Sequence, residues 1–151
     1  MPPCTNAACK PTGGFLHNES TKEVHFIISK NWNYSRGDIY YANMDPSVGS
    51  EQGGERPVVV LQNDKGNQHS PTLIIATLTS RVDKKRHLPT HVLLDQNPGL
   101  KVPSVVQLEQ IFTIDKCRLQ RFVGQTSAEE MKRIEAALKI SLGLTPLFAK
   151  G

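Results

Sequence analysis

The sequence predicts a mainly β fold with some α structure (α+β): a small curled β-barrel followed by one amphipathic helix at the C-terminal end. Two observations lead to this prediction. Short apolar or β-branched segments are separated by turn signals roughly every ten residues, a spacing typical of small barrels. The one clear helical pattern comes after them, so the helix is expected to bury its apolar face against the sheet.

The strands follow from the apolar runs. They are expected at residues 38–42, 58–62, 72–79, 91–94, 104–108 and 112–114. The runs at 58–62 and 72–79 are almost continuously apolar or β-branched, which indicates strands buried on both faces. Three glycines allow positive φ in a loop at 46–56, and residues 63–67 carry turn chemistry.

The C-terminal helix is the clearest element. Thr126 and Glu129 match a capping box, in which a hydroxyl and a carboxylate satisfy free N–H groups at the first turn. Gly143 is suited to end the helix. The apolar positions at helical spacing are Met131, Ile134, Leu138 and Leu142.

The chain divides into one domain and two flanking segments. Residues 34–144 form the expected domain, residues 1–33 a Pro- and Gly-containing N-terminal extension, and residues 145–151 a tail. Residues 23–30 are compatible either with an edge strand or with a cap on an open barrel end. There is no secretory signal and no membrane-spanning stretch, so we expect a cytoplasmic protein without a membrane partner.

The net charge and the cysteine content exclude few classes of function. The net charge of +4, from 18 basic and 14 acidic residues, is too mild to indicate nucleic acid by itself. The odd set of Cys4, Cys9 and Cys117 indicates neither a disulfide framework nor a zinc site. Free thiols fit a reducing cytoplasm. No metal and no cofactor is expected.

The glycine-rich loop at 49–57, GSEQGGERP, has the most chemical content. Its small residues let a ligand approach main-chain N–H groups, and Arg56 can grip a phosphate with its planar fork of donors. Pro57 biases Arg56 toward an extended conformation, which narrows the directions open to its side chain. Taken alone, the loop is more readily interpreted as a flexible connector with a solvated arginine, because it matches no phosphate motif.

Other polar groups lie at the ends of the expected strands. Thr79 and Ser80 can donate hydrogen bonds to a substrate, or simply suit a strand and a turn. Glu109 either partners Arg56 or faces water. His69, His87 and His91 are lone histidines without a visible partner. The loop at 81–87 either tracks an RNA backbone or is ordinary solvated surface. Its basic side chains, apart from histidine, are Arg81, Lys84, Lys85 and Arg86.

Together these segments resemble the MazF/PemK toxin family. The resemblance covers about residues 34–144. It rests on RGDIYYANMDPSVGSEQGGERPVVVLQND (36–64), GNQHSPTLIIATLTS (66–80), LPTHV (88–92), VQLEQIFTID (106–115) and the closing helix. It implies an SH3-like (PemK/CcdB-type) barrel that forms a homodimer. It also implies metal-independent cleavage of single-stranded RNA, including mRNA, at short sequences, leaving 2′,3′-cyclic phosphate and 5′-hydroxyl ends. The partner that it implies is a MazE-like antitoxin protein.

Functional residues are carried over by position in the matching motifs. The family's catalytic arginine and threonine fall on Arg56 and Thr79. Glu51 has a suitable charge for the general base, provided that burial raises its pKa. Gln52, Asn63 and Asp64 are expected to flank one mouth and read base edges. The complete set of expected RNA-binding residues is Ser50, Gln52, Asn63, Asp64, Ser80, Arg81, Lys84, Lys85, Arg86 and Glu109.

Two departures from the family pattern leave other functions open. Glu55 adds a negative charge beside Arg56, and Phe112 stands where relatives often carry an arginine, so a stacking ring replaces a cation. One alternative is a protein-binding inhibitor like the gyrase-poisoning CcdB toxins, which share the barrel. The other is a catalytically silent homologue that binds RNA or the antitoxin.

Overall fold

The computed structural model describes residues 33–82 and 88–145. The segment expected as an edge strand or cap, 23–30, and the basic residues Lys84, Lys85 and Arg86 lie outside the described residues. The assignment of residues 1–33 as an extension and 145–151 as a tail stays a prediction.

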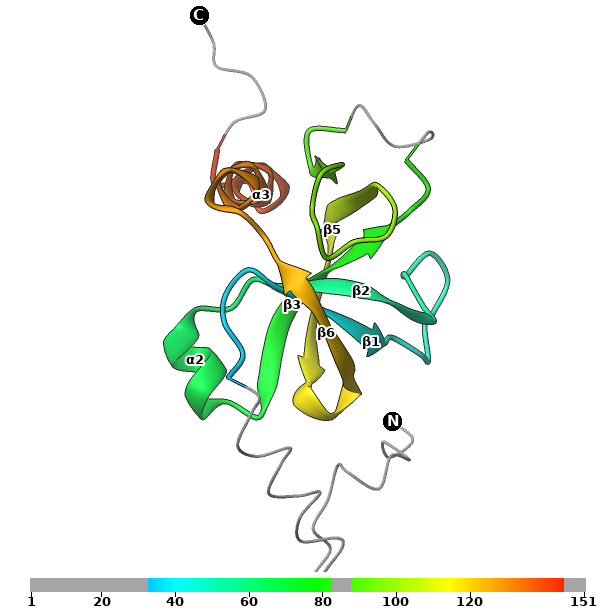
Figure 1. The fold of residues 1–151 in the computed structure, drawn as a ribbon, viewed down its shortest axis with the longest axis vertical. Coiled ribbons are helices and arrows are strands. Elements are labelled where there is room, and N and C mark those ends of the chain that lie inside the picture. The colour runs from blue at the N-terminus through cyan, green and yellow to red at the C-terminus, as the bar shows by residue number, and fades with distance from the viewer. Residues whose placement is uncertain (1–32, 83–87, 146–151) are drawn as a thin grey trace, which may run out of the picture.

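A six-stranded antiparallel sheet forms the body of the domain and curls strongly on itself (Figure 1). Its strands lie in the order β4-β5-β3-β2-β1-β6, so β4 and β6 are the two edges. The strands are β1 (Asp38–Asn43), β2 (Glu55–Val60), β3 (Thr72–Thr79), β4 (His91–Leu94), β5 (Ser104–Asp115) and β6 (Leu119–Gln125). The helical elements are α2 (Asp64–His69), the 3-10 turn η1 (Lys116–Arg118) and α3 (Ala128–Ser141). The mainly β fold with a C-terminal helix is confirmed.

The two central strands carry apolar side chains on both faces. Val59 and Ala76 belong to one core, which the sheet shares with α3, whereas Val58 and Ile75 belong to a second core on the other face. Each of these four side chains is fully buried. The expectation that these runs form strands buried on both faces is confirmed, and it explains why they lack a polar alternation.

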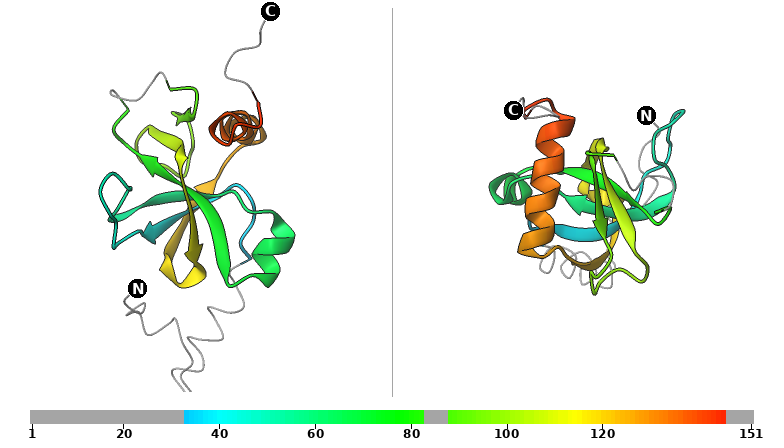
Figure 2. Two further views of the ribbon diagram at one scale, coloured as in Figure 1. Left: turned by 180° about the vertical axis from the view of Figure 1, so that it is seen from behind. Right: turned by 90° about the horizontal axis from the view of Figure 1, so that it is seen from above.

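Helix α3 closes one core. It lies against one face of the curled sheet when the molecule is viewed from above (Figure 2), and Ile134 and Ala137 are buried between them. The capping box begins one residue later than expected: Ser127 accepts from the Glu130 N–H, and Glu130 accepts from the Ser127 N–H. Thr126 instead donates its hydroxyl hydrogen to the Gly37 carbonyl, which makes Ser127 the last non-helical residue.

The structure also corrects three local expectations. The turn expected at 63–67 is the short helix α2, because Asn63 accepts from the Gly66 N–H at 2.8 Å and caps its first turn. The two strands expected at 104–108 and 112–114 are one strand, β5. Its pairing with β3 steps from Ile111 to Gln107, a bulge that leaves the residues between them off the ladder. The polar edge strand β6 has no apolar alternation and was missed.

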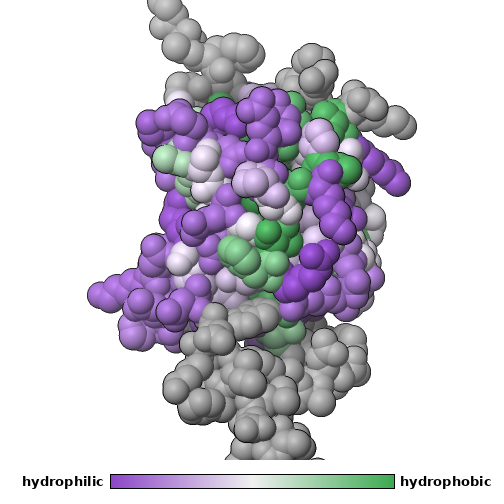
Figure 3. Space-filling view, in the orientation of Figure 1, coloured by the Kyte–Doolittle hydropathy of each residue, from purple (hydrophilic) through white to green (hydrophobic). Residues whose placement is uncertain are grey.

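Surface and cysteine features complete the description. Polar residues cover most of the face seen in Figure 3, and apolar residues gather there in small clusters. Cys117 is disulfide-bonded, so the expectation of free thiols is wrong for this residue. Phe112 is half-buried and packs against the second core. No helix in the described part of the chain is long and apolar enough to cross a membrane.

We expect Ile134→Ala to lower the free energy of unfolding by about 2–5 kcal/mol, because it removes a fully buried side chain that joins α3 to the sheet. Urea unfolding followed by circular dichroism measures the change. Lys139→Ala, on the exposed side of the same helix, is the control and should change stability little. Equal effects of the two substitutions would mean that α3 does not pack on the sheet as described.

Candidate functional site

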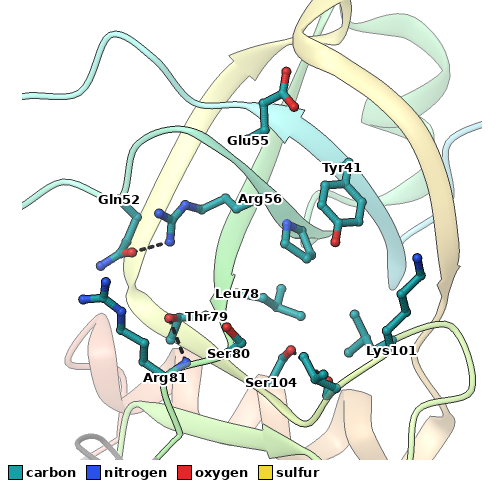
Figure 4. Close-up of a pocket in the computed structure, with 13 residues that line it drawn as sticks. Tyr41, Gln52, Glu55, Arg56, Leu78, Thr79, Ser80, Arg81, Lys101 and Ser104 are labelled. Carbon is teal, nitrogen blue, oxygen red and sulfur yellow. Dashed lines mark hydrogen bonds between the residues drawn. The ribbon is translucent and has the colours of Figure 1, made fainter.

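A pocket of about 500 Å³ opens where β2 begins and β3 ends. Strands β1 and β2 form one side, the turn after β3 forms another, and residues 100–104, which lead into β5, form a third (Figure 4). The polar side chains in its lining include Tyr41, Gln52, Arg56, Thr79, Arg81 and Lys101. The pocket therefore collects residues that lie far apart in the sequence.

Arg56 is held in place by the loop that precedes it. Its Nε donates to the Gly53 carbonyl at 2.7 Å, and its Nη1 donates to Oε1 of Gln52. These two bonds use donors on two different nitrogens of the guanidinium and fix its plane, which leaves its remaining donors available to a ligand. The flexible-connector interpretation of the loop does not fit this arrangement.

A second guanidinium lies close to the first. Burial, and after it the positive charge of Arg81, lowers the pKa of Arg56, and the Asp45 carboxylate offsets this only in part. Lys101 adds a third cation to the pocket, against the single carboxylate of Glu55. The pocket is therefore suited to an anion, since an anion would relieve the repulsion between the two guanidiniums.

The loop between β1 and β2 needs its glycines. Gly54 has a φ of +74° and donates its N–H to Oδ1 of Asp45 at 2.8 Å. A Cβ on Gly53 would collide with the side chains of Ser47 and Asp45. The loop consequently folds back tightly, and this brings Gln52 to Arg56.

Gln110 supports the same loop from β5. Its Oε1 accepts from the Gln52 N–H at 3.3 Å, and its Nε2 donates to the Ser50 carbonyl at 3.3 Å. Gln110 lies in the bulge that interrupts the pairing of β5 with β3, so its side chain is directed at the loop and not along the ladder. Sequence reasoning assigned it no role.

Thr79 and Ser80 end β3 at the pocket. Oγ1 of Thr79 accepts from the Arg81 N–H at 3.3 Å, and the Ser80 carbonyl accepts from the Val82 N–H at 2.9 Å. Both residues and Arg81 line the pocket together with Arg56 and Gln52. Five of the predicted site residues are thus brought together.

Other predicted residues lie elsewhere. Asn63 caps α2, and Asp64 accepts from the Arg36 N–H at 2.7 Å, both beyond the end of β2 opposite Arg56. The expectation that they flank one mouth with Gln52 is wrong. Glu51 is exposed, does not line the pocket, and accepts from the Val48 N–H at 2.9 Å. Ser50 takes part through its carbonyl alone in the bond from Gln110.

Glu109 partners a histidine and not Arg56. Its Oε1 is hydrogen-bonded to Nε2 of His91, and its Oε2 accepts from the Thr90 hydroxyl at 2.9 Å. Burial acts to raise the pKa of Glu109, but the bonds from His91, its own backbone and Thr90 outweigh it and leave the pKa lowered. His91, taken from the sequence as a lone histidine, therefore has a carboxylate partner.

Several pocket residues had no signal in the sequence. Tyr41 belongs to β1, Ser104 begins β5, and Lys101 belongs to the connection before β5, so only the curl of the sheet reveals that they share a pocket. Within residues 33–82 and 88–145, no group of three or more His, Cys, Asp or Glu side chains is placed to hold a metal ion.

The fold is similar to that of solved toxin structures. A MazF structure from Deinococcus radiodurans matches with a TM-score of 0.65 and 25% identity, over 75% of this chain and 99% of that one. An endoribonuclease from a mycobacterial species, solved in complex with its cognate antitoxin, matches with a TM-score of 0.63 and 25% identity. That match covers 74% of this chain and 97% of the other. The class defined by this architecture is that of the small endoribonuclease toxins.

The family is shown by sequence. Residues 35–142 match the PemK-like, MazF-like toxins of type II toxin–antitoxin systems, and the chain belongs to that family. The endoribonuclease EndoA of Bacillus subtilis is 51% identical over 110 residues, which are 72% of this chain and 94% of that protein.

Glu109 should make the free energy of unfolding depend on pH in the acidic range. Because its pKa is lowered in the folded protein, its contribution is complete above the unfolded-state pKa and is lost as the pH falls through the folded-state pKa. Unfolding midpoints measured between about pH 7 and about pH 3 should fall more steeply for the wild type than for Glu109→Gln. Glu129→Gln, at an exposed ion pair, is the control. Parallel curves for wild type and Glu109→Gln would contradict the assignment.

Proposed function

We propose that this protein cuts single-stranded RNA, including mRNA, at a short sequence without a metal, leaving 2′,3′-cyclic phosphate and 5′-hydroxyl ends. The observation that carries the proposal is the position of Arg56, Arg81 and Thr79 around one pocket. Two close guanidiniums and a hydroxyl at a strand end suit a phosphodiester that gains negative charge during cleavage.

Cleavage proceeds by attack of the 2′-oxygen on the adjacent phosphorus. The 2′-hydroxyl loses its proton, a bond forms from the 2′-oxygen to phosphorus, and the bond to the 5′-oxygen breaks as that oxygen takes up a proton. Arg56 stabilises the charge on the five-coordinate phosphate, because its plane is fixed in advance by Gly53 and Gln52. Arg81 shares this role from the other side.

Arg56 acts mainly as a cation. An ordinary arginine binds its proton so tightly that deprotonation at neutral pH would cost roughly 8 kcal/mol. Burial and Arg81 lower the pKa of Arg56, which reduces this cost, but they do so by repulsion that a bound phosphate removes. Thr79 is placed to donate a hydrogen bond to a phosphate oxygen.

The RNA path extends beyond the pocket. Gln52 and Ser80 line it, and Lys84, Lys85 and Arg86 follow Arg81 in the sequence after Val82 and Asp83. Cations in this stretch attract the RNA backbone without reading its sequence. The expected roles of four residues in RNA binding remain predictions, and none of the four lines the pocket: Ser50, Asn63, Asp64 and Glu109.

We infer the partners from the family. Mycobacterial and Deinococcus relatives were solved in complex with an antitoxin, described for the latter as MazE, and a MazE-like antitoxin is the partner that we propose here. The active unit that we propose is a cytoplasmic homodimer. Two alternative functions are inhibition of gyrase and binding of RNA or the antitoxin without catalysis. The next experiment distinguishes both from RNA cleavage.

Arg56→Ala should reduce kcat by about 10²–10³-fold, the usual cost of removing a group that stabilises developing charge. Purified protein is incubated with a long single-stranded RNA in excess EDTA, and the cut ends are mapped. Cleavage at one short motif, with cyclic-phosphate ends, is expected from the wild type, and Arg56→Lys should recover only part of the activity. Absence of cleavage by the wild type across a long, varied RNA would favour the binding-only functions.

Glu51→Gln tests the general base. If Glu51 takes the 2′-proton, the variant should lose about 10²–10⁴-fold in kcat and lose the acid limb of the pH–rate profile. The matched control is Glu55→Gln, whose carboxylate lines the pocket and accepts from Gln120 at 2.7 Å. An unchanged kcat in Glu51→Gln would show that Glu51 is not the general base. Its role would then be structural, through the hydrogen bond that it accepts from the Val48 N–H within the loop.

A further inference from the structure

The pocket has two chemically different halves, and the proposed cleavage uses only one. The first, the cationic half, consists of Gln52, Arg56, Thr79 and Arg81. The second, the apolar half, consists of Tyr41, Pro57, Leu78, Leu100 and Val102. Figure 4 shows Gln52 and Arg81 at one end of the pocket and Tyr41 with Lys101 at the other.

The apolar half is open to a ligand. Val102 is 53% exposed, and Tyr41, Pro57 and Leu100 are each only partly buried. Apolar side chains that stay accessible inside a pocket gain free energy when a flat apolar group covers them. This half therefore offers contact area that a phosphate cannot use.

Tyr41 places a polar group in this apolar setting. It is paired across the sheet with Pro57 on β2 and with Arg121 on β6. The Arg121 guanidinium lies over the ring, 4.1 Å from its centroid. The ring is thus held by its neighbours, and its hydroxyl points into the pocket (Figure 4). A phenol fixed in this way can donate or accept one hydrogen bond at the edge of a bound ring.

The two halves are one continuous pocket, and its charge favours an anion. Among the described residues that line the pocket, the cations Arg56, Arg81 and Lys101 stand against one carboxylate, that of Glu55. A ligand that fills both halves needs a phosphate at one end and a flat, largely apolar ring with polar edges at the other. A nucleotide has both, and a volume of about 500 Å³ is within the range of ligand pockets.

We propose that the apolar half is a nucleoside subsite, which takes the base of the nucleotide next to the phosphate that is cut. Val102 and Leu100 cover the ring, and the Tyr41 hydroxyl binds its polar edge. This assignment rests on the proposed function, and it makes Tyr41 and Val102 determinants of the RNA sequence that is cut.

The test asks whether substitutions in the apolar half change the contribution of one particular base to RNA affinity. RNA oligonucleotides carry the mapped cleavage sequence with a 2′-deoxy nucleotide at the attacking position, so that they bind without being cut. An abasic nucleotide is placed at each position in turn, and affinity is measured by fluorescence anisotropy for wild type, Val102→Ser and Tyr41→Phe. Leu142→Ser, which removes a comparably exposed apolar side chain at the end of α3, is the control.

At one position beside the cut, loss of the base should weaken wild-type binding by about tenfold and Val102→Ser binding by much less. Tyr41→Phe should keep its affinity for the abasic RNA and lose discrimination among the four bases at that position. Leu142→Ser should follow the wild type throughout.

An equal abasic penalty in wild type and Val102→Ser at every position, with RNA still cut, would overturn the subsite and leave the proposed function standing. An apolar half that binds an acidic peptide and no RNA base would also give an equal abasic penalty in the two proteins. A wild type that neither binds nor cuts any RNA would instead refute the proposed function itself.

Discussion

Burial of β2 and β3 on both faces is the constraint on which the rest of the structure depends. Val58, Val59, Leu73 and Ile75 are each fully buried, so neither strand has a side free for polar chemistry along its middle. A charged group there would lose its hydration without a partner. Charged residues in these two strands therefore stand only at the start of β2, and the curl of the sheet brings this start beside the end of β3, where Thr79 lies. Arg56 and Thr79 meet there for that reason.

Much of the fold was predictable because burial leaves a pattern in the sequence. Continuous apolar runs gave the central strands, and helical spacing gave α3, since both elements must hide those side chains. β6 was not predictable, because it is an edge strand without apolar alternation, and its side-chain contacts to β1, such as Phe122 with Tyr40, appear only once the two strands are paired. Likewise, the step from Ile111 to Gln107 that joins two expected strands into β5 is a property of the pairing with β3.

The candidate site was predictable only in part, for a related reason. Arg56, Thr79, Ser80 and Arg81 stand next to recognisable strands, so their neighbourhood could be inferred. Tyr41 was expected only as part of a strand and Lys101 comes from a segment without a motif, and both reach the pocket through the curl of the sheet. Nearness along the chain was also misleading. Asn63 lies seven positions from Arg56 in sequence, but the length of β2 separates them, and Asn63 serves instead as the cap of α2.

The bulge in β5 has an evolutionary consequence. Gln110 leaves the ladder there and grips the backbone at Ser50 and Gln52. The length of the β1–β2 loop and the position of the bulge must therefore match, although about sixty residues separate them in the sequence. An insertion or deletion in either segment would break the hydrogen bonds of Gln110 to the loop unless the other segment changed as well. Relatives that differ in the length of one of these segments are therefore expected to differ in the other, while the strands between them stay the same length.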